Sequence, residues 1–133
     1  MPFADSQGIR IYYDDTGEGE PVLLCLSGWC NTHAIFAPLA ERLSADNRVL
    51  SIDWRGHGNS QASDRDFGFP EMARDAVAVM QDSNAHSVIP IAQGQAPWAA
   101  VEMHRLIGER MPKMVISSWP VISPVEIHLH PAF

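Results

Sequence analysis

The sequence of 133 residues predicts one α/β domain in which helices flank an open, mostly parallel sheet. Short, continuous apolar runs recur along the chain, and such runs are typical of strands that are buried on both faces. Stretches with helical spacing of apolar residues lie between the runs, so that strand and helix alternate as they do in units with right-handed crossovers. The predicted strands of this pattern are 22–26, 48–53, 88–92 and 114–116.

The first strand of the chain has a different pattern. Residues 9–13 alternate between apolar and polar side chains, which predicts a strand with one exposed face. The segment 14–21 that follows is rich in Asp, Gly and Glu and ends in Pro21. It predicts a turn that leads into a hairpin-like connection.

Three helices are predicted between the later strands. Their ranges are 36–44, 70–81 and 97–108, and Pro70 and Pro97 suit the first helical position. The apolar positions expected to be buried are Phe36, Leu39, Ala40 and Leu43 in the first helix, Met72, Ala73, Ala76, Val77 and Met80 in the second, and Trp98, Val101, Leu106 and Ile107 in the third.

Composition excludes several classes of function. The chain has 9 lysine and arginine residues against 16 aspartate and glutamate residues, a net charge of −7. We therefore expect neither nucleic acid nor an anionic membrane surface as a partner, because affinity for both depends on basic residues. The sequence shows no export signal and no apolar run long enough for a bilayer, and it holds only two cysteines. These features predict a cytoplasmic protein with reduced thiols.

The most specific segment of the sequence is Asp53–Ser60, Asp-Trp-Arg-Gly-His-Gly-Asn-Ser, directly after a predicted buried strand. Its glycines allow tight turning, and Arg55 can fix the loop through several hydrogen-bond donors. We interpret the segment as a structural loop that supports a neighbouring site, with His57 as a loop histidine.

A second loop, 26–33, follows the first buried strand and reads Leu-Ser-Gly-Trp-Cys-Asn-Thr-His. Loops at the carboxyl ends of parallel strands are where ligands bind in open α/β sheets, and the backbone N–H of Trp29 could point into that crevice. Cys30 and His33 lack a second pair of ligands, so we expect no metal site. The same holds for His128 and His130 near the C-terminus.

A third segment, 91–98, reads Ile-Ala-Gln-Gly-Gln-Ala-Pro-Trp and predicts a strand, a sharp turn and the start of a helix. In α/β-hydrolases a turn of this kind carries the motif G-x-S-x-G, whose serine is the nucleophile. Here Gly94 stands at the serine position, and Ala92 and Ala96 replace the flanking glycines. These small residues allow the turn to keep its shape, but the hydroxyl of the serine is absent.

With these three segments together, residues 9–119 resemble the N-terminal half of an α/β-hydrolase-fold protein. Within that superfamily the chain is most similar to the cofactor-independent 2,4-dioxygenases of 3-hydroxy-4-quinolones. The narrower resemblance rests on Gly28-Trp29-Cys30, on 53–58 and on Trp98. It implies a partial domain over 1–119 without the cap and the last strands, followed by an irregular tail over 120–133.

The resemblance also implies a reaction without metal or cofactor. A His/Asp pair would remove the proton of the substrate 3-hydroxyl, and the anion of the small aromatic heterocycle would react directly with dioxygen, with loss of carbon monoxide. The backbone N–H groups of Trp29 and Gln95 would bind the oxyanion. Asn31 stands where these dioxygenases have a histidine that contacts substrate, and Trp98 would also contribute to substrate binding.

The chain departs from this family at the catalytic positions. Gly94 replaces the elbow serine, and Ser118 stands where the family has the aspartate that orients the catalytic histidine. That histidine would lie beyond the end of this sequence, so we expect the isolated chain to be inactive. We also expect Met114–Ser118 to form an exposed sheet edge, through which the chain could pair with a second copy.

Two other functions remain open from the sequence. One is hydrolysis of esters or related bonds, for which Ser27 and Ser60 are the nearest serines, although neither stands at the predicted turn. The other is a non-catalytic domain that binds an aromatic ligand or a partner chain.

Overall fold

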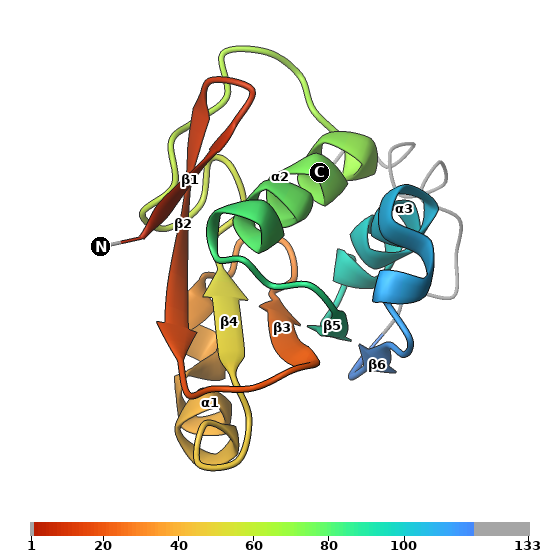
Figure 1. The fold of residues 1–133 in the computed structure, drawn as a ribbon. Helices are drawn as coiled ribbons and strands as arrows, with labels where there is room; N and C mark the ends of the chain where they lie inside the picture. The colour runs from red at the N-terminus through yellow and green to blue at the C-terminus, as the bar shows by residue number, and fades with distance from the viewer. Residues whose placement is uncertain (1, 119–133) are drawn as a thin grey trace.

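The computed structural model describes residues 2–118, which form a six-stranded sheet with helices on both faces (Figure 1). The strands lie in the order β1-β2-β4-β3-β5-β6. The elements along the chain are β1 (Phe3–Ser6), β2 (Ile9–Thr16), β3 (Val22–Leu26), the 3-10 helix η1 (His33–Phe36), α1 (Ala37–Leu43), β4 (Val49–Ile52), α2 (Phe69–Asp82), β5 (Val88–Ala92), α3 (Ala96–Ile107), the 3-10 helix η2 (Gly108–Arg110) and β6 (Val115–Ile116).

Strand direction brings the predicted loops to one edge of the sheet. β3 is parallel to both β4 and β5, and β6 is parallel to β5. The carboxyl ends of these four strands therefore meet at the same edge, which is where open α/β sheets bind ligands. Within residues 2–118, antiparallel pairing is limited to β2 with β4 and β2 with β1. The other strand pairs are parallel, which confirms the prediction of a mostly parallel sheet.

The central strands are buried on both faces because helices cover each side. α2 and α3 pack on one face, where Leu24, Leu50 and Val88 belong to the main core. η1 and α1 cover the other face, where Cys25 and Val49 pack with Phe36. Neighbouring residues of β3 and β4 thus enter different cores, as the two-residue period of a strand requires. This double burial explains why these strands are continuous apolar runs.

One prediction about the first strands was wrong, and one strand was not predicted. Residues 14–16 were expected in a turn, but they extend β2 and pair with β4, with Thr16 opposite Val49. Polar side chains are tolerated there because Asp15 and Thr16 are exposed. β1 was not predicted, and it pairs with β2 through a short turn at Gln7–Gly8.

The helices occur where the sequence predicts them, but parts of their buried faces differ. Leu39 in α1 and Leu106 in α3 were expected in the core and are 37% and 56% exposed. Val101 is only half-buried. The core face of α3 is lined by small residues and two long ones, namely Ala96, Ala99, Ala100, Met103 and Ile107. Helical spacing alone did not distinguish this face from the row of larger residues beside it.

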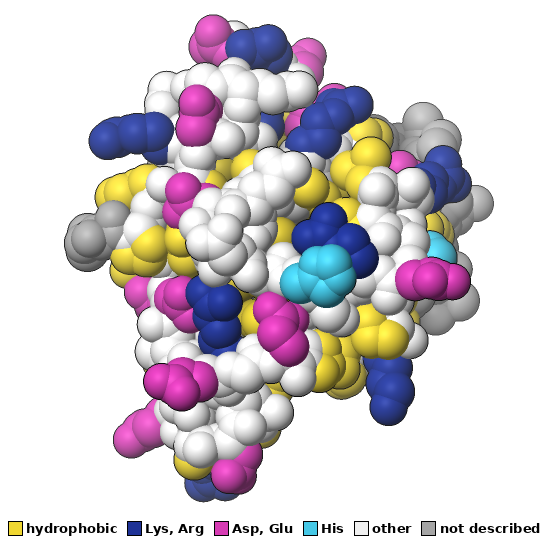
Figure 2. All heavy atoms as spheres, in the orientation of Figure 1, with side chains coloured by type: hydrophobic (Ala, Val, Ile, Leu, Met, Phe, Trp, Pro, Cys, Tyr) yellow, Lys and Arg dark blue, Asp and Glu magenta, His cyan; other side chains and the backbone are white. Residues whose placement is uncertain are grey.

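Among the described residues, no helix has both the length and the apolar character needed to cross a membrane. Figure 2 shows charged side chains of both signs scattered over the face formed by α2 and α3, with hydrophobic side chains visible between them. Within residues 2–118, β6 is the last strand on its side of the sheet, and its residues Val115 and Ile116 are 49% and 40% exposed. The expected exposed edge is confirmed for this part of the chain.

Candidate functional site at the carboxyl edge of the sheet

The turn at Gly94 has the sharp strand-to-helix geometry that the sequence predicts. Gly94 lies between the end of β5 and the start of α3, with a positive φ of 62°. The N–H of Ala96 donates to the backbone oxygen of Gln93 over 3.1 Å and closes the turn. A Cβ atom on Gly94 would lie 3.3 Å from the Cα of Gly28. The turn therefore packs directly against the loop after β3.

Two glutamine side chains join this turn to the loop after β3. The N–H of Gly28 donates to Oε1 of Gln93 over 3.2 Å, and the N–H of Trp29 donates to Oε1 of Gln95 over 3.3 Å. The fold thus brings Trp29 and Gln95, the two expected oxyanion-binding residues, into contact. Their contact runs through the Gln95 side chain, a feature that the backbone argument from sequence did not include.

The two positions that depart from the dioxygenase pattern also lie together. The N–H of Gly94 donates to Oγ of Ser118, at 2.9 Å. Asn31 belongs to the same loop as Trp29, and its N–H donates to the backbone oxygen of Gly28 over 3.2 Å. Trp98 lies in the first turn of α3 and is half-buried. All six candidate residues therefore lie at or next to the carboxyl ends of β3, β5 and β6.

The indole of Trp29 is half exposed and forms an aromatic cluster at the rim of this edge. Its ring contacts that of His57 edge-on, at 5.2 Å between centroids, and that of Phe67 at 6.0 Å. Nε2 of His57 accepts the N–H of Cys30 over 3.1 Å, and Nδ1 lies 3.1 Å from the backbone oxygen of Arg55, to which it can only donate. Both ring nitrogens of His57 thus have partners within the two loops of the site.

A fully buried carboxylate, Asp53, holds two loops of the site together. It accepts the backbone N–H of His33 at 2.7 Å, the N–H of Asn59 at 2.9 Å and Nδ1 of His33 at 2.9 Å. Nε2 of His33 lies 3.5 Å from the Asp14 carboxylate. This His33–Asp53 pair was not predicted, because an aspartate directly after a buried strand indicates a carboxylate at this edge but not its partner.

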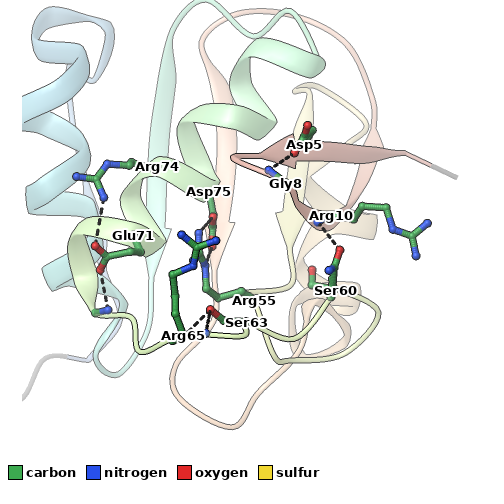
Figure 3. A network of polar contacts seen from close by, with 12 residues as sticks. Asp5, Gly8, Arg10, Arg55, Ser60, Ser63, Arg65, Glu71, Arg74 and Asp75 are labelled. Atoms are coloured by element: carbon green, nitrogen blue, oxygen red, sulfur yellow. Dashed lines mark hydrogen bonds and ion pairs between the residues drawn. The ribbon is translucent and has the colours of Figure 1, made fainter.

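The loop 53–60 is also fixed to α2, as the sequence analysis predicted for Arg55. Nε and Nη2 of Arg55 donate to the two carboxylate oxygens of Asp75 over 2.8 Å and 2.6 Å, and both side chains are buried (Figure 3). The hydrogen bond to Asp75 raises the pKa of Arg55. The guanidinium also lies over the ring of Phe67, 5.6 Å from its centroid. A charged, bidentate contact thus supports the loop on which Trp29 packs.

Other candidate groups have structural contacts. His33 of the Cys30–His33 pair is bound to Asp53, and the described residues contain no group of three His, Cys, Asp or Glu side chains arranged for a metal. His128 and His130 lie outside the described residues, as does the expected tail. Ser27 is buried and Oγ of Ser60 donates to the backbone oxygen of Asp53 over 2.6 Å, and neither serine lies on the β5–α3 turn.

A comparison with protein families identifies this arrangement. A model of the alpha/beta hydrolase fold matches residues 21–93, which include β3, β4, β5 and both loops of the site. The chain belongs to the α/β-hydrolase fold family. Solved structures agree, because an esterase from Exiguobacterium antarcticum superposes with a TM-score of 0.82 at 24% identity over 90% of the chain and 45% of that structure.

Within the α/β-hydrolase fold family, this chain is similar to quinolone dioxygenases. It is 36% identical over 111 residues to a 2-heptyl-3-hydroxy-4(1H)-quinolone dioxygenase of Mycobacteroides abscessus, covering 82% of the chain and 41% of that protein. It is 30% identical to the 1H-3-hydroxy-4-oxoquinoline 2,4-dioxygenase of Pseudomonas putida, covering 100% of the chain and 49% of that protein.

A solved structure agrees with these sequence matches. The structure of AqdC with its product, described as recognising and cleaving the ring of the Pseudomonas quinolone signal, has a TM-score of 0.84 and 32% identity. It is matched over 93% of this α/β-hydrolase-fold chain and 47% of its own length. The chain therefore spans about half the length of the relatives that it matches.

Proposed function

We propose that this α/β-hydrolase-fold chain is a partial relative of the cofactor-independent dioxygenases that cleave 3-hydroxy-4-quinolone rings, and that it contributes their oxyanion-binding edge. The observation that supports this most is the contact between the Gly28–Trp29 loop and the Gly94 turn. The likeness to quinolone dioxygenases over 82% of the chain supports the choice of substrate.

The proposed ligand is the anion of a 3-hydroxy-4-quinolone. In the proposed reaction a base removes the 3-hydroxyl proton, the anion reacts with dioxygen, and the ring opens with release of carbon monoxide. The N–H groups of Trp29 and Gln95 would bind the anionic oxygen, since backbone donors held in fixed positions stabilise developing charge. The half-exposed Trp29 ring offers an aromatic surface beside them.

We further propose that residues 1–133 bind such a ligand without turning it over. Gly94 offers no hydroxyl. The described histidines either form hydrogen bonds within the loops or lie away from Gly94. His57 and His33 use their ring nitrogens within the loops, His86 precedes β5 at the opposite end from Gly94, and His104 lies on the exposed side of α3. Proton removal from a bound ligand needs a base within hydrogen-bond reach, and none of these four supplies it at Gly94.

We also propose a cytoplasmic location. Both cysteines, Cys25 and Cys30, are free thiols in the structure, and Cys30 is exposed. Exposed free thiols persist in a reducing compartment.

Incubation with 2-heptyl-3-hydroxy-4-quinolone under oxygen tests the proposal. We expect quenching of tryptophan fluorescence on binding and no release of carbon monoxide. Release of carbon monoxide at enzyme-like rates would overturn the proposed inactivity. Absence of any binding would overturn the proposed ligand, and binding of unrelated aromatic compounds with equal affinity would favour a general binding domain instead.

A further inference from the structure

The carboxamide of Gln95 occupies the donor that the proposed function assigns to the ligand. Oε1 of Gln95 lies 3.3 Å from the backbone nitrogen of Trp29, in hydrogen-bond geometry. Each backbone N–H has one hydrogen to donate. While Gln95 accepts the hydrogen bond from the Trp29 N–H, the oxygen of a ligand cannot form a full hydrogen bond with the same N–H.

The two neighbouring donors are occupied in the same way. Oε1 of Gln93 accepts the N–H of Gly28 at 3.2 Å, and Oγ of Ser118 accepts the N–H of Gly94 at 2.9 Å. Side-chain oxygens thus accept all three of these backbone N–H groups, and the Trp29 N–H is the one of the three that the proposed function assigns to the ligand. The Gln95 contact is the longest of the three, and it is exposed, as is the Ser118 contact, whereas the Gln93 contact is partly buried.

We propose that Gln95 is an autoinhibitory gate, whose Oε1 stands in for the oxyanion of the ligand and must leave Trp29 before the ligand binds. This inference rests on the proposed function, because it takes the Trp29 N–H as the ligand-binding donor. The exchange is favourable for an anion, since a charged oxygen forms a stronger hydrogen bond with the N–H than a neutral amide oxygen does. The apparent affinity is then the intrinsic affinity multiplied by the fraction of molecules in which Trp29 is free.

Three variants test the gate. Gln95→Ala removes the side chain, and Gln95→Met keeps its length without an acceptor oxygen. Gln93→Ala is the matched control. It also removes a glutamine side chain, two positions earlier in the sequence, but this side chain accepts from the N–H of Gly28 and not from that of Trp29. In the absence of ligand, the backbone amide resonance of Trp29 should shift and its hydrogen exchange should accelerate in both Gln95 variants. In Gln93→Ala the same changes should appear at Gly28 instead.

Ligand titrations complete the test, with benzoate as a simple aromatic oxyanion and 2-heptyl-3-hydroxy-4-quinolone as the proposed ligand. We expect both Gln95 variants to bind benzoate about five-fold more tightly than the unmodified chain, the factor that one ordinary net hydrogen bond corresponds to. Gln93→Ala should not bind it more tightly. The quinolone should follow benzoate.

Each other outcome is decisive. An unmoved Trp29 amide in Gln95→Ala would overturn the gate, because the contact would not exist in solution. Weaker benzoate binding in the Gln95 variants would also overturn it, because Gln95 would then assist the ligand. Tighter binding in Gln95→Ala but not in Gln95→Met would replace the hydrogen-bonded gate by steric blockage. If the variants bind benzoate more tightly and none binds the quinolone, the gate stands and the proposed function fails.

Discussion

Two features of position 94 disfavour any side chain there. Its φ of 62° is a conformation that costs an ordinary residue about 1 kcal/mol or more, and a Cβ atom would meet the Cα of Gly28 at 3.3 Å. The position that carries a serine in the hydrolase motif would therefore be strained and tightly packed in this chain if it held a side chain. A glycine relieves the strain, at the cost of the hydroxyl.

We expect Gly94→Ala to lower the free energy of unfolding by about 2 kcal/mol, from strain and close contact together. Gly56→Ala is the matched control, because Gly56 has a φ of 75° and a Cβ atom there would meet nothing within 4 Å. It should lose only about 1 kcal/mol, the strain alone. Urea unfolding measures both. Equal losses would mean that the Gly28 loop moves away without cost.

The residues of the site could be predicted in part. The turn at Gly94 followed from its position between an apolar run and a helix, and the support role of Arg55 followed from its donors. The Gln95 contact with Trp29 could not be predicted, because it depends on a side-chain rotamer and on the spacing of two strands. The His33–Asp53 pair joins two loops that are 20 positions apart, and no local pattern shows that they meet.

At the scale of elements, one ion pair connects the loop after β4 with α2. Arg55 and Asp75 are 4% and 0% exposed, and a buried charge without its partner is strongly unfavourable. The pair therefore fixes where the loop 53–60 lies on the helix. Trp29 depends on this loop through His57 and Phe67.

We expect Asp75→Asn to lower the free energy of unfolding by about 3–5 kcal/mol, because it leaves Arg55 buried without an opposite charge. The exposed pair Arg65–Asp64 provides the control, with side chains 66% and 80% exposed. Asp64→Asn should change stability by less than about 1 kcal/mol. Chemical denaturation measures both variants. A small effect of Asp75→Asn would mean that water reaches Arg55 in solution.

Most strands and helices could be predicted because their apolar runs are buried in a regular way. β3 and β5 begin and end at the predicted residues, whereas β1 has only four residues and escaped notice. The end of β2 was misread because exposed polar residues are also typical of turns. The misplaced leucines, Leu39 and Leu106, show that residue size does not determine which side of a helix faces the core.

At the scale of the whole molecule, both tyrosines stabilise the fold in their neutral forms. Burial and a hydrogen bond to Asp82 raise the pKa of Tyr13, and a hydrogen bond to Asp14 raises the pKa of Tyr12 to about 12. A raised pKa in the folded state means that this stabilisation is complete below the ordinary value of about 10 and decreases as the pH rises above it.

We therefore expect the free energy of unfolding to fall as the pH rises from about 10 towards 12, with phenolate absorbance that appears only as the protein unfolds. Tyr13→Phe should weaken this pH dependence, since it removes the more strongly shifted group. Thermal unfolding over this pH range checks both statements. Phenolate absorbance near pH 10 in the folded protein would contradict them.

The edge at β6 leads to a second prediction for the whole molecule. We propose that two copies pair through this edge, where Val115 and Ile116 are exposed, so that association increases with concentration. Ile116→Lys should reduce association in sedimentation velocity. Leu106→Lys, which changes an exposed leucine of α3 away from the edge, should not. Equal effects of the two variants would exclude β6 as the contact.

The Arg55–Asp75 pair also bears on how such a sequence can change over generations. A substitution that neutralises one position alone would leave a buried charge without its partner and so destabilise the chain. We therefore expect the two positions to co-vary, so that relatives show either both charges or two uncharged residues in their place.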